Sequence, residues 1–340
     1  MKNSTSFLDN LELAELHAHL GAALSGTELW EMAHDQGLKL PTKDYRTFEK
    51  MVSVGEAKDL EDQLKIFDLT EKIQSSPEAM FHAVQHVISE AYRKNNITTI
   101  ELRFNPIFRC QEGERDMDHI LIFALQGMER AQLKYNVRAG LILCLDRRLS
   151  LEKNAAIVRK AIKYHDRGIV GIDMAGPTER NKYCRSFQPK DITNLVSEAK
   201  EAGLGITFHT GEATDTEEMW QVVEELKPNR IGHGVACVND EKLMDKLREE
   251  NIVLELCPYS NLHTKVLKDY QAVKNVIDAL KKHGVLFTIN TDWPATLSLS
   301  LRDLIAELVR NRILSEKEII HCNEIAHQAA FVHVPFMSSK

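Results

Sequence analysis

The chain has 340 residues, of which 43% are hydrophobic and 27% charged, and its formal net charge is −7. This composition is typical of a soluble globular protein, and the length allows one barrel-sized domain or two smaller ones. The mild acidity argues against a nucleic-acid polymer or an anionic membrane as partner, because both require a basic surface. A small-molecule partner is therefore expected, and the oligomeric state stays open.

The distribution of polar residues and cysteines predicts a cytoplasmic protein. Residues 1–10 lack the basic segment and apolar run of a secretory signal, and no apolar stretch is long enough for a transmembrane helix. The six cysteines are spread singly, without the spacing of a zinc finger or a redox motif. Cys144 and Cys257 lie inside apolar runs, so we expect both thiols to be buried. These features favour a reducing compartment.

Eight apolar, strand-like runs recur along the chain, and amphipathic helical stretches separate most of them. The runs are Leu13–Leu20, Thr98–Phe104, Val137–Leu145, Ile169–Ala175, Gly205–His209, Arg230–His233, Ile252–Cys257 and Val285–Asn290. The clearest helical stretches are Ile120–Tyr135, Asp191–Ala202, Glu217–Leu226, Asp240–Glu250 and Val273–His283. Strands that alternate with helices and are rich in Ile, Val and Leu predict an α/β fold, a (β/α)8 TIM barrel. An open doubly wound sheet is disfavoured because no glycine-rich loop follows the first run.

One connection is much longer than the others. About residues 22–95 separate the first two runs and look mostly helical, for example at Thr27–Gln36 and Leu60–Ile73. A segment after a barrel strand lies on the face that carries active sites, so we expect a helical insertion there. It would be either a lid or pocket wall, or a docked decoration without moving parts. Residues 299–340 are expected to form C-terminal helices on the barrel exterior, within a single domain that spans residues 1–340.

Histidines and a carboxylate stand at the ends of three predicted strands. His17 and His19 end the first run, and residues two apart on a strand point to the same side. His209 ends the fifth run, and Asp292 follows the eighth. The carboxyl ends of barrel strands meet at one face, where three histidines and a carboxylate suit zinc with one position left for water. The sequence therefore predicts one zinc ion held by His17, His19, His209 and Asp292.

Two more residues stand beside these predicted ligands. Glu212 follows His209 by three residues, where it can move a proton between the attacking water and the substrate. His233 ends the neighbouring sixth run and can orient or deprotonate that water, whose pKa the metal lowers toward about 7. The competing interpretation of Glu212 is a surface carboxylate or a cap of the helix that begins near Thr216.

Other charged residues receive structural interpretations. Glu101 and Arg103 share one face of the second run, and we expect them to form an ion pair inside the barrel. Asp146, Arg147 and Arg148 follow the third run. An arginine there could meet a phosphate or carboxylate of the substrate, although a solvated loop is the expected arrangement.

The strand-end segments together resemble the adenosine/AMP deaminase family of the metal-dependent amidohydrolase superfamily. The matching segments are ELHAHL (15–20), IDMAG (172–176), HTGE (209–212), RIGHG (230–234), LCPYSN (256–261) and NTD (290–292). The resemblance implies the same four zinc ligands, with Asp292 also hydrogen-bonding the nucleophile. It further implies that His233 activates the water and that Glu212 protonates a ring nitrogen of an aminopurine. Attack at the amino-bearing carbon would then release ammonia.

The resemblance is complete for catalysis but incomplete for substrate binding. Gly176 matches the family's glycine whose backbone N–H contacts the purine ring. Gly21 and Trp293, however, replace two family aspartates that contact the ribose 5′-hydroxyl and the purine N7. We therefore expect a deaminase of an aminopurine nucleoside or related amino-heterocycle. The alternatives are another substrate such as adenine, a modified AMP or a pterin, a barrel hydrolase of an amide, lactone or phosphoester, and a binder without catalysis.

Overall fold

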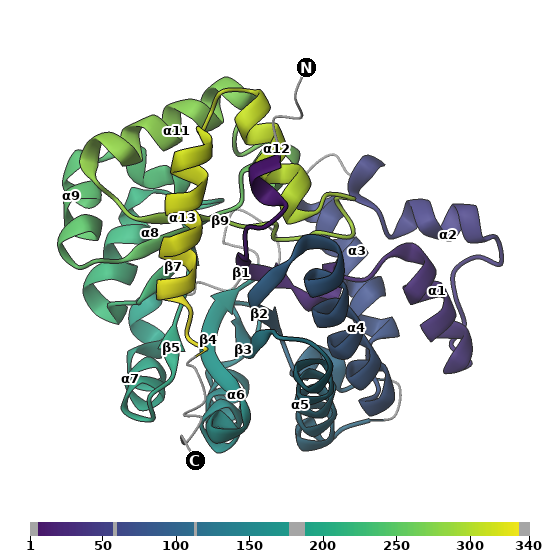
Figure 1. The fold of residues 1–340 in the computed structure, drawn as a ribbon. Helices are drawn as coiled ribbons and strands as arrows, with labels where there is room; N and C mark the ends of the chain where they lie inside the picture. The colour runs from purple at the N-terminus through teal and green to yellow at the C-terminus, as the bar shows by residue number, and fades with distance from the viewer. Residues whose placement is uncertain (1–5, 57–59, 112–113, 177–187, 333–340) are drawn as a thin grey trace, which may run out of the picture.

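Strands and helices alternate along the chain in the computed structural model, which describes residues 6–56, 60–111, 114–176 and 188–332 (Figure 1). The strands are β1 Leu13–His19, β2 Ile97–Phe104, β3 Arg138–Asp146, β4 Ile169–Ala175, β5 Gly205–Ile206, β6 His209–Thr210, β7 Arg230–His233, β8 Val253–Leu256 and β9 Phe287–Ile289. The helices are α1 Gly26–Asp35, α2 Tyr45–Met51, α3 Leu60–Ile73, α4 Pro77–Asn95, α5 Met117–Lys134, α6 Leu151–Lys163, α7 Thr193–Glu201, α8 Thr216–Gln221, α9 Glu241–Glu249, α10 Pro258–His263, α11 Tyr270–His283, α12 Leu301–Arg310 and α13 Glu316–Ala329.

Neighbouring strands pair in parallel and in chain order. Strands β1 to β5 form one sheet, and β6 to β9 form another. The chain runs from β5 into β6 through residues 207–208, and the Gly232 N–H donates to the Phe208 carbonyl at 2.9 Å. On the other side, Ala18 forms a parallel bridge with Asp292, which brings β1 beside the chain that leaves β9. A parallel α/β arrangement with this strand order confirms the predicted TIM-barrel fold.

The fifth predicted strand is divided in two. We expected one run over Gly205–His209, whereas β5 pairs with β4 and β6 pairs with β7. The chain changes its hydrogen-bonding partner halfway along the run, so each ladder is only two residues long. The second of these short strands begins at His209, and this places that histidine at the barrel mouth.

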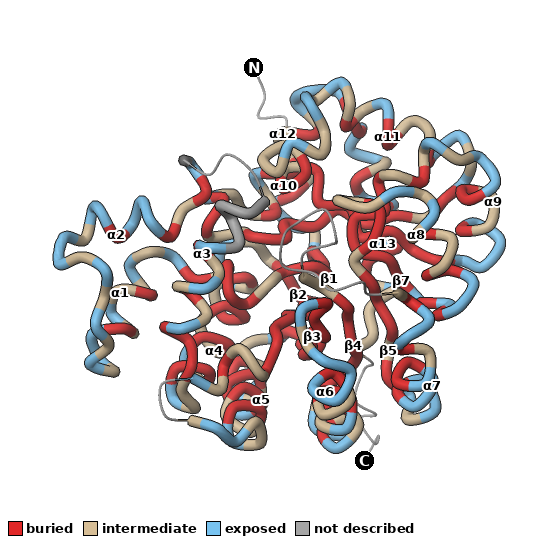
Figure 2. Tube along the Cα trace, turned by 180° about the vertical axis from the view of Figure 1, so that it is seen from behind, coloured by how far each residue is buried: buried red, intermediate tan, exposed pale blue. Residues whose placement is uncertain are grey.

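The core lies where the inner faces of the helices meet the strands, which are buried along almost their whole length (Figure 2). Helix α4 packs along α5 and against β2, and α13 packs on β1 and β9. Cys144 and Cys257 are buried, as predicted. Within the described residues, no helix is both long and apolar enough to cross a membrane.

The helices between β1 and β2 divide into two groups. Helix α4 covers the strands, whereas α1 and α2 project to one side of them (Figure 1). Ser25 begins α1 with a capping box, and Ser76 caps α4 just before Pro77. Helix α3 returns toward the barrel and contacts the short helix Leu20–Ala22, which directly follows β1. It therefore lies against the segment that carries the first two predicted ligands.

The chain after α13 packs at the N-terminal ends of β5 and β7, opposite the barrel mouth. The Arg230 guanidinium stacks over the Phe331 ring at 3.6 Å, and the Phe331 N–H donates to the Glu101 carboxylate. A Cβ at Gly205 would lie only 2.2 Å from the Phe331 ring, so a side chain there would exclude this contact. The segment after α13 thus packs against charged residues of the barrel interior.

Candidate active site

Four side chains from three strand ends converge at the mouth of the barrel. The ligand atoms of His17, His19, His209 and Asp292 all lie within 4.8 Å of one another. The Nε2 atoms of His19 and His209 are 3.2 Å apart, and Asp292 Oδ1 lies 3.4 Å from His19 Nε2. Donors around a tetrahedral zinc ion at 2.0–2.1 Å stand about 3.3 Å apart. The spacing of these atoms therefore fits such an ion.

Two of the four ligand atoms make no hydrogen bond to any described residue. His17 Nε2 and Asp292 Oδ1 are buried and lack a hydrogen-bond partner among the described residues, and they lie 3.5 Å apart. A buried polar atom without a partner carries a desolvation penalty, so native structures seldom leave one. A cation between the two atoms would satisfy both.

Carboxylates behind the ligands orient them. His17 Nδ1 donates to Glu255 Oε2 at 2.6 Å, and His209 Nδ1 donates to Asp173 at 2.9 Å. With the proton on Nδ1, each Nε2 presents its lone pair to the site, which is the usual arrangement for metal-bound histidine. Ser260 Oγ donates to Asp292 Oδ2 at 2.6 Å and so leaves Oδ1 facing the histidines.

Arg103, Asp173, Arg230 and Glu255 form a buried charge cluster beneath the ligands. Arg103 donates to Asp173 at 3.0 Å and to Glu255 at 2.7 Å, and Arg230 donates to Glu255 at 2.6 Å. Burial opposes ionisation of Glu255, but the two arginines lower its pKa to about 2. The pKa of Asp173 is likewise held far below its usual value by His209 and Arg103, against its burial. Both carboxylates therefore stay charged and keep their histidines in place.

Two structural interpretations from the sequence are corrected here. Glu101 and Arg103 are inside the barrel but do not pair with each other, because Glu101 bonds Arg230 and Arg103 bonds Asp173. The solvated loop expected at residues 146–148 is wrong for Asp146 and Arg147, whereas Arg148 is exposed. Asp146 and Arg147 are buried, and Arg147 donates to the carbonyls of Gly176 and His209. These partners come from distant segments, so local sequence gives no sign of them.

Glu212 and His233 lie beside the ligand group, as predicted. His233 Nε2 is 3.6 Å from Glu212 Oε2 and 3.8 Å from Asp292 Oδ2. Asn261 Nδ2 contacts both, at 3.3 Å from Glu212 Oε1 and 3.1 Å from His233 Nδ1. Burial raises the pKa of Glu212 and lowers that of His233 to about 4. The pair therefore favours a protonated carboxyl and a neutral imidazole, the states of an acid and a base.

Two residues of this site have a strained backbone conformation. His233 and Asp292 have φ values of 61° and 64°, in the left-handed region that non-glycine residues avoid. Such a conformation costs about 1–3 kcal/mol per residue and persists where the surrounding structure enforces it. Gly232 also has a steric role, because a Cβ there would lie 2.9 Å from His17 Cε1.

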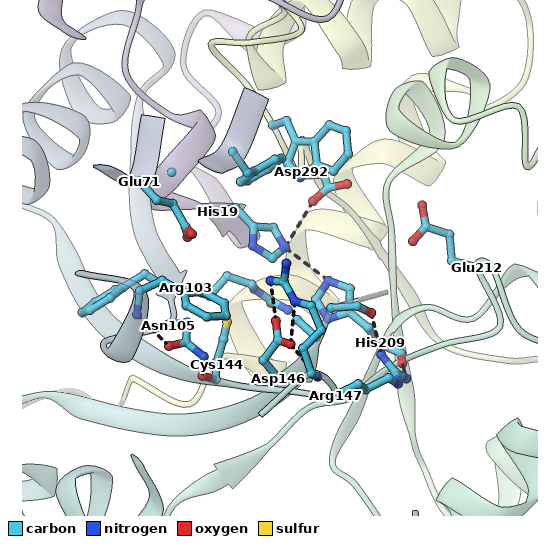
Figure 3. Close-up of a pocket in the computed structure, with 18 of the residues that line it drawn as sticks. His19, Glu71, Arg103, Asn105, Cys144, Asp146, Arg147, His209, Glu212 and Asp292 are labelled. Carbon is cyan, nitrogen blue, oxygen red and sulfur yellow. Dashed lines mark hydrogen bonds and ion pairs between the residues drawn. The ribbon is translucent and has the colours of Figure 1, made fainter. Parts of the chain in front are cut away.

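A pocket opens from the ligand group, and all three predicted substrate-binding residues line it (Figure 3). Gly176 has a φ of 92°, and a Cβ there would lie 2.6 Å from Asp146 Oδ2, so only glycine fits. Trp293 packs edge-on against Phe67 of α3, with ring centroids 4.8 Å apart. We call Gly21, Phe67, Glu71 and Trp293 the pocket rim, since these residues line the pocket from the segments around α3.

Sequence reasoning missed several residues that complete this site. A charge inside the apolar run Ile252–Cys257 was the available signal for Glu255, and Asn261 stood within a matching segment without being assigned a role. Phe67 and Glu71 had no such signal. They lie on one turn of α3, and only the packing of that helix against the barrel brings them to the pocket.

Comparisons with known proteins identify the family of this chain. The family model described as adenosine deaminase matches residues 13–337. The adenosine deaminase of Vibrio vulnificus is 28% identical over 323 residues, which cover 95% of each chain. That of Clostridium kluyveri is 29% identical over 293 residues, covering 85% of this chain and 81% of the relative.

Solved structures show the same architecture. The Arabidopsis N6-mAMP deaminase is 25% identical with a TM-score of 0.80, covering 96% of this chain and 95% of its own. The structure of the ADAL–IMP complex is 25% identical with a TM-score of 0.82, and the match covers 97% and 94%. The adenine deaminase of Arthrobacter aurescens, at 21% identity and a TM-score of 0.80 over 94% of both chains, shares the fold. This chain therefore belongs to the adenosine deaminase family, whose members are hydrolases of carbon–nitrogen bonds.

Proposed function

We propose that this chain is a zinc-dependent hydrolytic deaminase of an aminopurine nucleoside or a related amino-heterocycle. One zinc ion would be held by His17, His19, His209 and Asp292. The observation that carries the proposal is the meeting of these four ligand atoms, two of them buried without a partner, beside Glu212 and His233. The similarity to adenosine deaminases supports it, and two of the similar solved structures are complexes with IMP and GMP.

The residues around the ligand group suit hydrolysis of an amino-bearing ring carbon. Zinc bound there would supply a nucleophile at neutral pH by lowering the pKa of water. His233 is neutral at pH 7 and accepts the proton of the attacking water, while Asp292 Oδ2 orients that water. Burial raises the pKa of Glu212 and so favours the protonated form, which donates to a ring nitrogen and makes the adjacent carbon more electrophilic. The new C–O bond forms, the C–N bond breaks, and the amino group leaves as ammonia with the transferred proton.

The pocket walls suit a flat heterocycle. Trp293, Phe67, Phe104 and Phe108 present aromatic surface to the same space. We assign Gly176 to contact the ring through its backbone, and Trp293 to cover the ring or to donate its indole N–H. Gly21 leaves room for the group that the ring carries. A few polar groups in an otherwise apolar pocket are typical of small-molecule sites.

We also place this activity in the cytoplasm and in a single domain over residues 1–340. Support for the compartment comes from the cysteines: Cys110, Cys144, Cys237, Cys257 and Cys322 are all free thiols, although Cys184 lies outside the described residues. Free thiols persist best in a reducing compartment.

An ammonia-release assay tests the proposed function. Purified protein of measured zinc content is incubated with adenosine, adenine, AMP, N6-methyl-AMP and an aminopterin ring. We expect ammonia from at least one of these compounds. Zinc-loaded protein that releases no ammonia from any of them would overturn the proposal. Turnover of an ester, lactone or phosphoester without ammonia would replace it with another hydrolase.

A further inference from the structure

Side chains of α3 and the short helix Ile107–Arg109 occupy the space beside Gly21. A Cβ built on Gly21 would lie 3.2 Å from a Phe67 ring atom, 3.3 Å from Glu71 Cγ and 3.3 Å from Arg109 Nη2. These distances are tighter than ordinary van der Waals contacts, so any side chain at position 21 would push the others aside. Glycine at this position thus allows Glu71 to reach the pocket wall.

Glu71 and Arg109 form an ion pair whose two side chains differ in solvent exposure. Arg109 is fully buried, and Glu71 Oε1 lies 3.6 Å from its Nη2, while the Glu71 side chain keeps 15% exposure. The guanidinium nitrogens of Arg109 have no hydrogen-bond partner among the described residues. Burial raises the pKa of Glu71, and Arg109 opposes this rise. The Glu71 carboxyl group therefore faces the pocket, and the buried Arg109 guanidinium lies behind it (Figure 3).

The arginines that line the pocket already have partners. Arg103 bonds Asp173 and Glu255, and Arg147 bonds Glu218 at 3.0 Å. Arg148 is bidentate on Asp146, with both bonds at 2.9 Å, and its guanidinium also covers the Phe108 ring. At the buried Arg103 and Arg147, a phosphate would have to displace a carboxylate before it could pair, and this displacement is costly. The charge of the more exposed Arg148 is already balanced by Asp146.

The outer end of the pocket is acidic. A second cavity continues from it and shares Asp68, Glu71, Phe108 and Arg148 with it, while Gln111 completes the wall. Asp68 and Glu71 bring two carboxyl groups to this end, while the charge of the neighbouring Asp146 is balanced by Arg148. Carboxylates accept hydrogen bonds from hydroxyl groups and repel phosphate. This end of the pocket therefore suits a neutral group that carries hydroxyls.

We propose that Glu71 determines specificity by accepting hydrogen bonds from the hydroxyls of a neutral sugar on the heterocycle, and by excluding the 5′-phosphorylated form. Arg109 is the positioning residue that holds Glu71 at the pocket wall. This inference rests on the proposed deaminase function and narrows its substrate to a nucleoside. It assigns the selection of the sugar to the helices between β1 and β2, separate from the residues that carry the chemistry.

A comparison of three substrates tests the role of Glu71. Ammonia release is measured with an aminopurine nucleoside, its 5′-monophosphate and the free base, for the wild type and Glu71→Gln. The wild type should prefer the nucleoside to the monophosphate. Glu71→Gln should lower kcat/KM for the nucleoside about 10- to 100-fold, mainly through KM, since a hydrogen bond to a charged group is worth that much. For the free base, the change should stay within about twofold, as for an inert substitution.

Matched variants and analogues separate recognition from folding. Glu249→Gln on α9 removes an exposed carboxylate far from this wall and serves as the control for charge. Nucleosides that lack the 2′-, 3′- or 5′-hydroxyl should lose kcat/KM in the wild type, and at least one of them should lose nothing further in Glu71→Gln. Glu71→Asp keeps the charge with a shorter reach. It should keep the discrimination against the monophosphate without restoring the wild-type KM.

Two outcomes would overturn this inference and leave the proposed deaminase function standing. They are a wild type that prefers the monophosphate, and an equal loss for nucleoside and free base in Glu71→Gln, which would make Glu71 a structural residue. Zinc-loaded wild type that releases no ammonia from any of the three substrates would instead remove the proposed function, and the inference with it. Thermal unfolding and zinc content of each variant show whether a loss reflects folding.

Discussion

The buried charge cluster and the pocket rim are built in opposite ways. Every residue of the cluster stands on a strand, namely β2, β4, β7 or β8, and its charges bond one another or the histidines. The rim comes from the segment after β1, from α3 and from the chain after β9, and two of its four residues are aromatic. Strand register fixes the first region, whereas connecting segments can change the second without disturbing the barrel. The comparison teaches that chemistry and substrate choice are separately adjustable in this chain.

The largest expected effect is that of Glu212→Gln. The variant keeps the shape of the side chain but cannot supply a proton, so kcat should fall by about 10²- to 10⁴-fold. Zinc content and thermal stability should match the wild type, because Glu212 is outside the ligand group. Ammonia release and metal analysis on the same sample measure both. A variant with undiminished turnover would show that the residue has no part in proton transfer.

Asp173→Asn tests whether the cluster acts through the metal ligands. His209 would lose its carboxylate partner, and such changes behind a ligand typically weaken metal affinity about 10- to 100-fold. Competition with a chromophoric chelator measures the affinity. The rim variant Trp293→Phe is the matched control and should bind zinc as the wild type does. If Asp173→Asn and Trp293→Phe bind zinc equally well, the buried charge cluster would not support the metal ligands more than the pocket rim does.

The cluster should also give the protein an acid-sensitive component of stability. The pKa of Glu255 is about 2 in the folded protein, below its ordinary value of 4.5. Its ionised form therefore contributes stability above pH 4.5, and this contribution is lost as the pH falls toward 2. Unfolding of chelator-treated wild type and Glu255→Gln across this range should show the variant weaker near pH 6 and the difference shrinking in acid. A difference that grows in acid would contradict the sign.

The smallest expected effect lies at the rim. Trp293→Phe keeps an aromatic ring beside Phe67 but removes the indole N–H and part of the surface. Aromatic pairs of this kind contribute about 0.5–1.5 kcal/mol, so KM should rise by about 2- to 12-fold with little change in kcat. Steady-state ammonia release measures the split. A fall in kcat as large as that of Glu212→Gln would place the rim within the catalytic machinery.

The part of the candidate site that the strands carry could be predicted from the sequence. His17, His19, His209 and Asp292 stand at or just after the ends of three predicted strands, and a barrel brings strand ends together, so the fold implied their meeting. The span of α3 was also predicted, over Leu60–Ile73. Its packing was not predictable, because the position of an added helix depends on tertiary contacts such as that between Phe67 and Trp293. Arg147 was misjudged for the same reason, since its acceptors come from distant strands.

Product analysis in water enriched in heavy oxygen tests the central claim most directly. Zinc-loaded wild type is incubated with the best aminopurine substrate. The mass of the product is measured by mass spectrometry, and the released ammonia is quantified. The account predicts one solvent oxygen in each product molecule and one ammonia released for each, with both formed about 10²- to 10⁴-fold more slowly by Glu212→Gln. A product without solvent oxygen, or turnover without ammonia, would contradict hydrolytic deamination at this site.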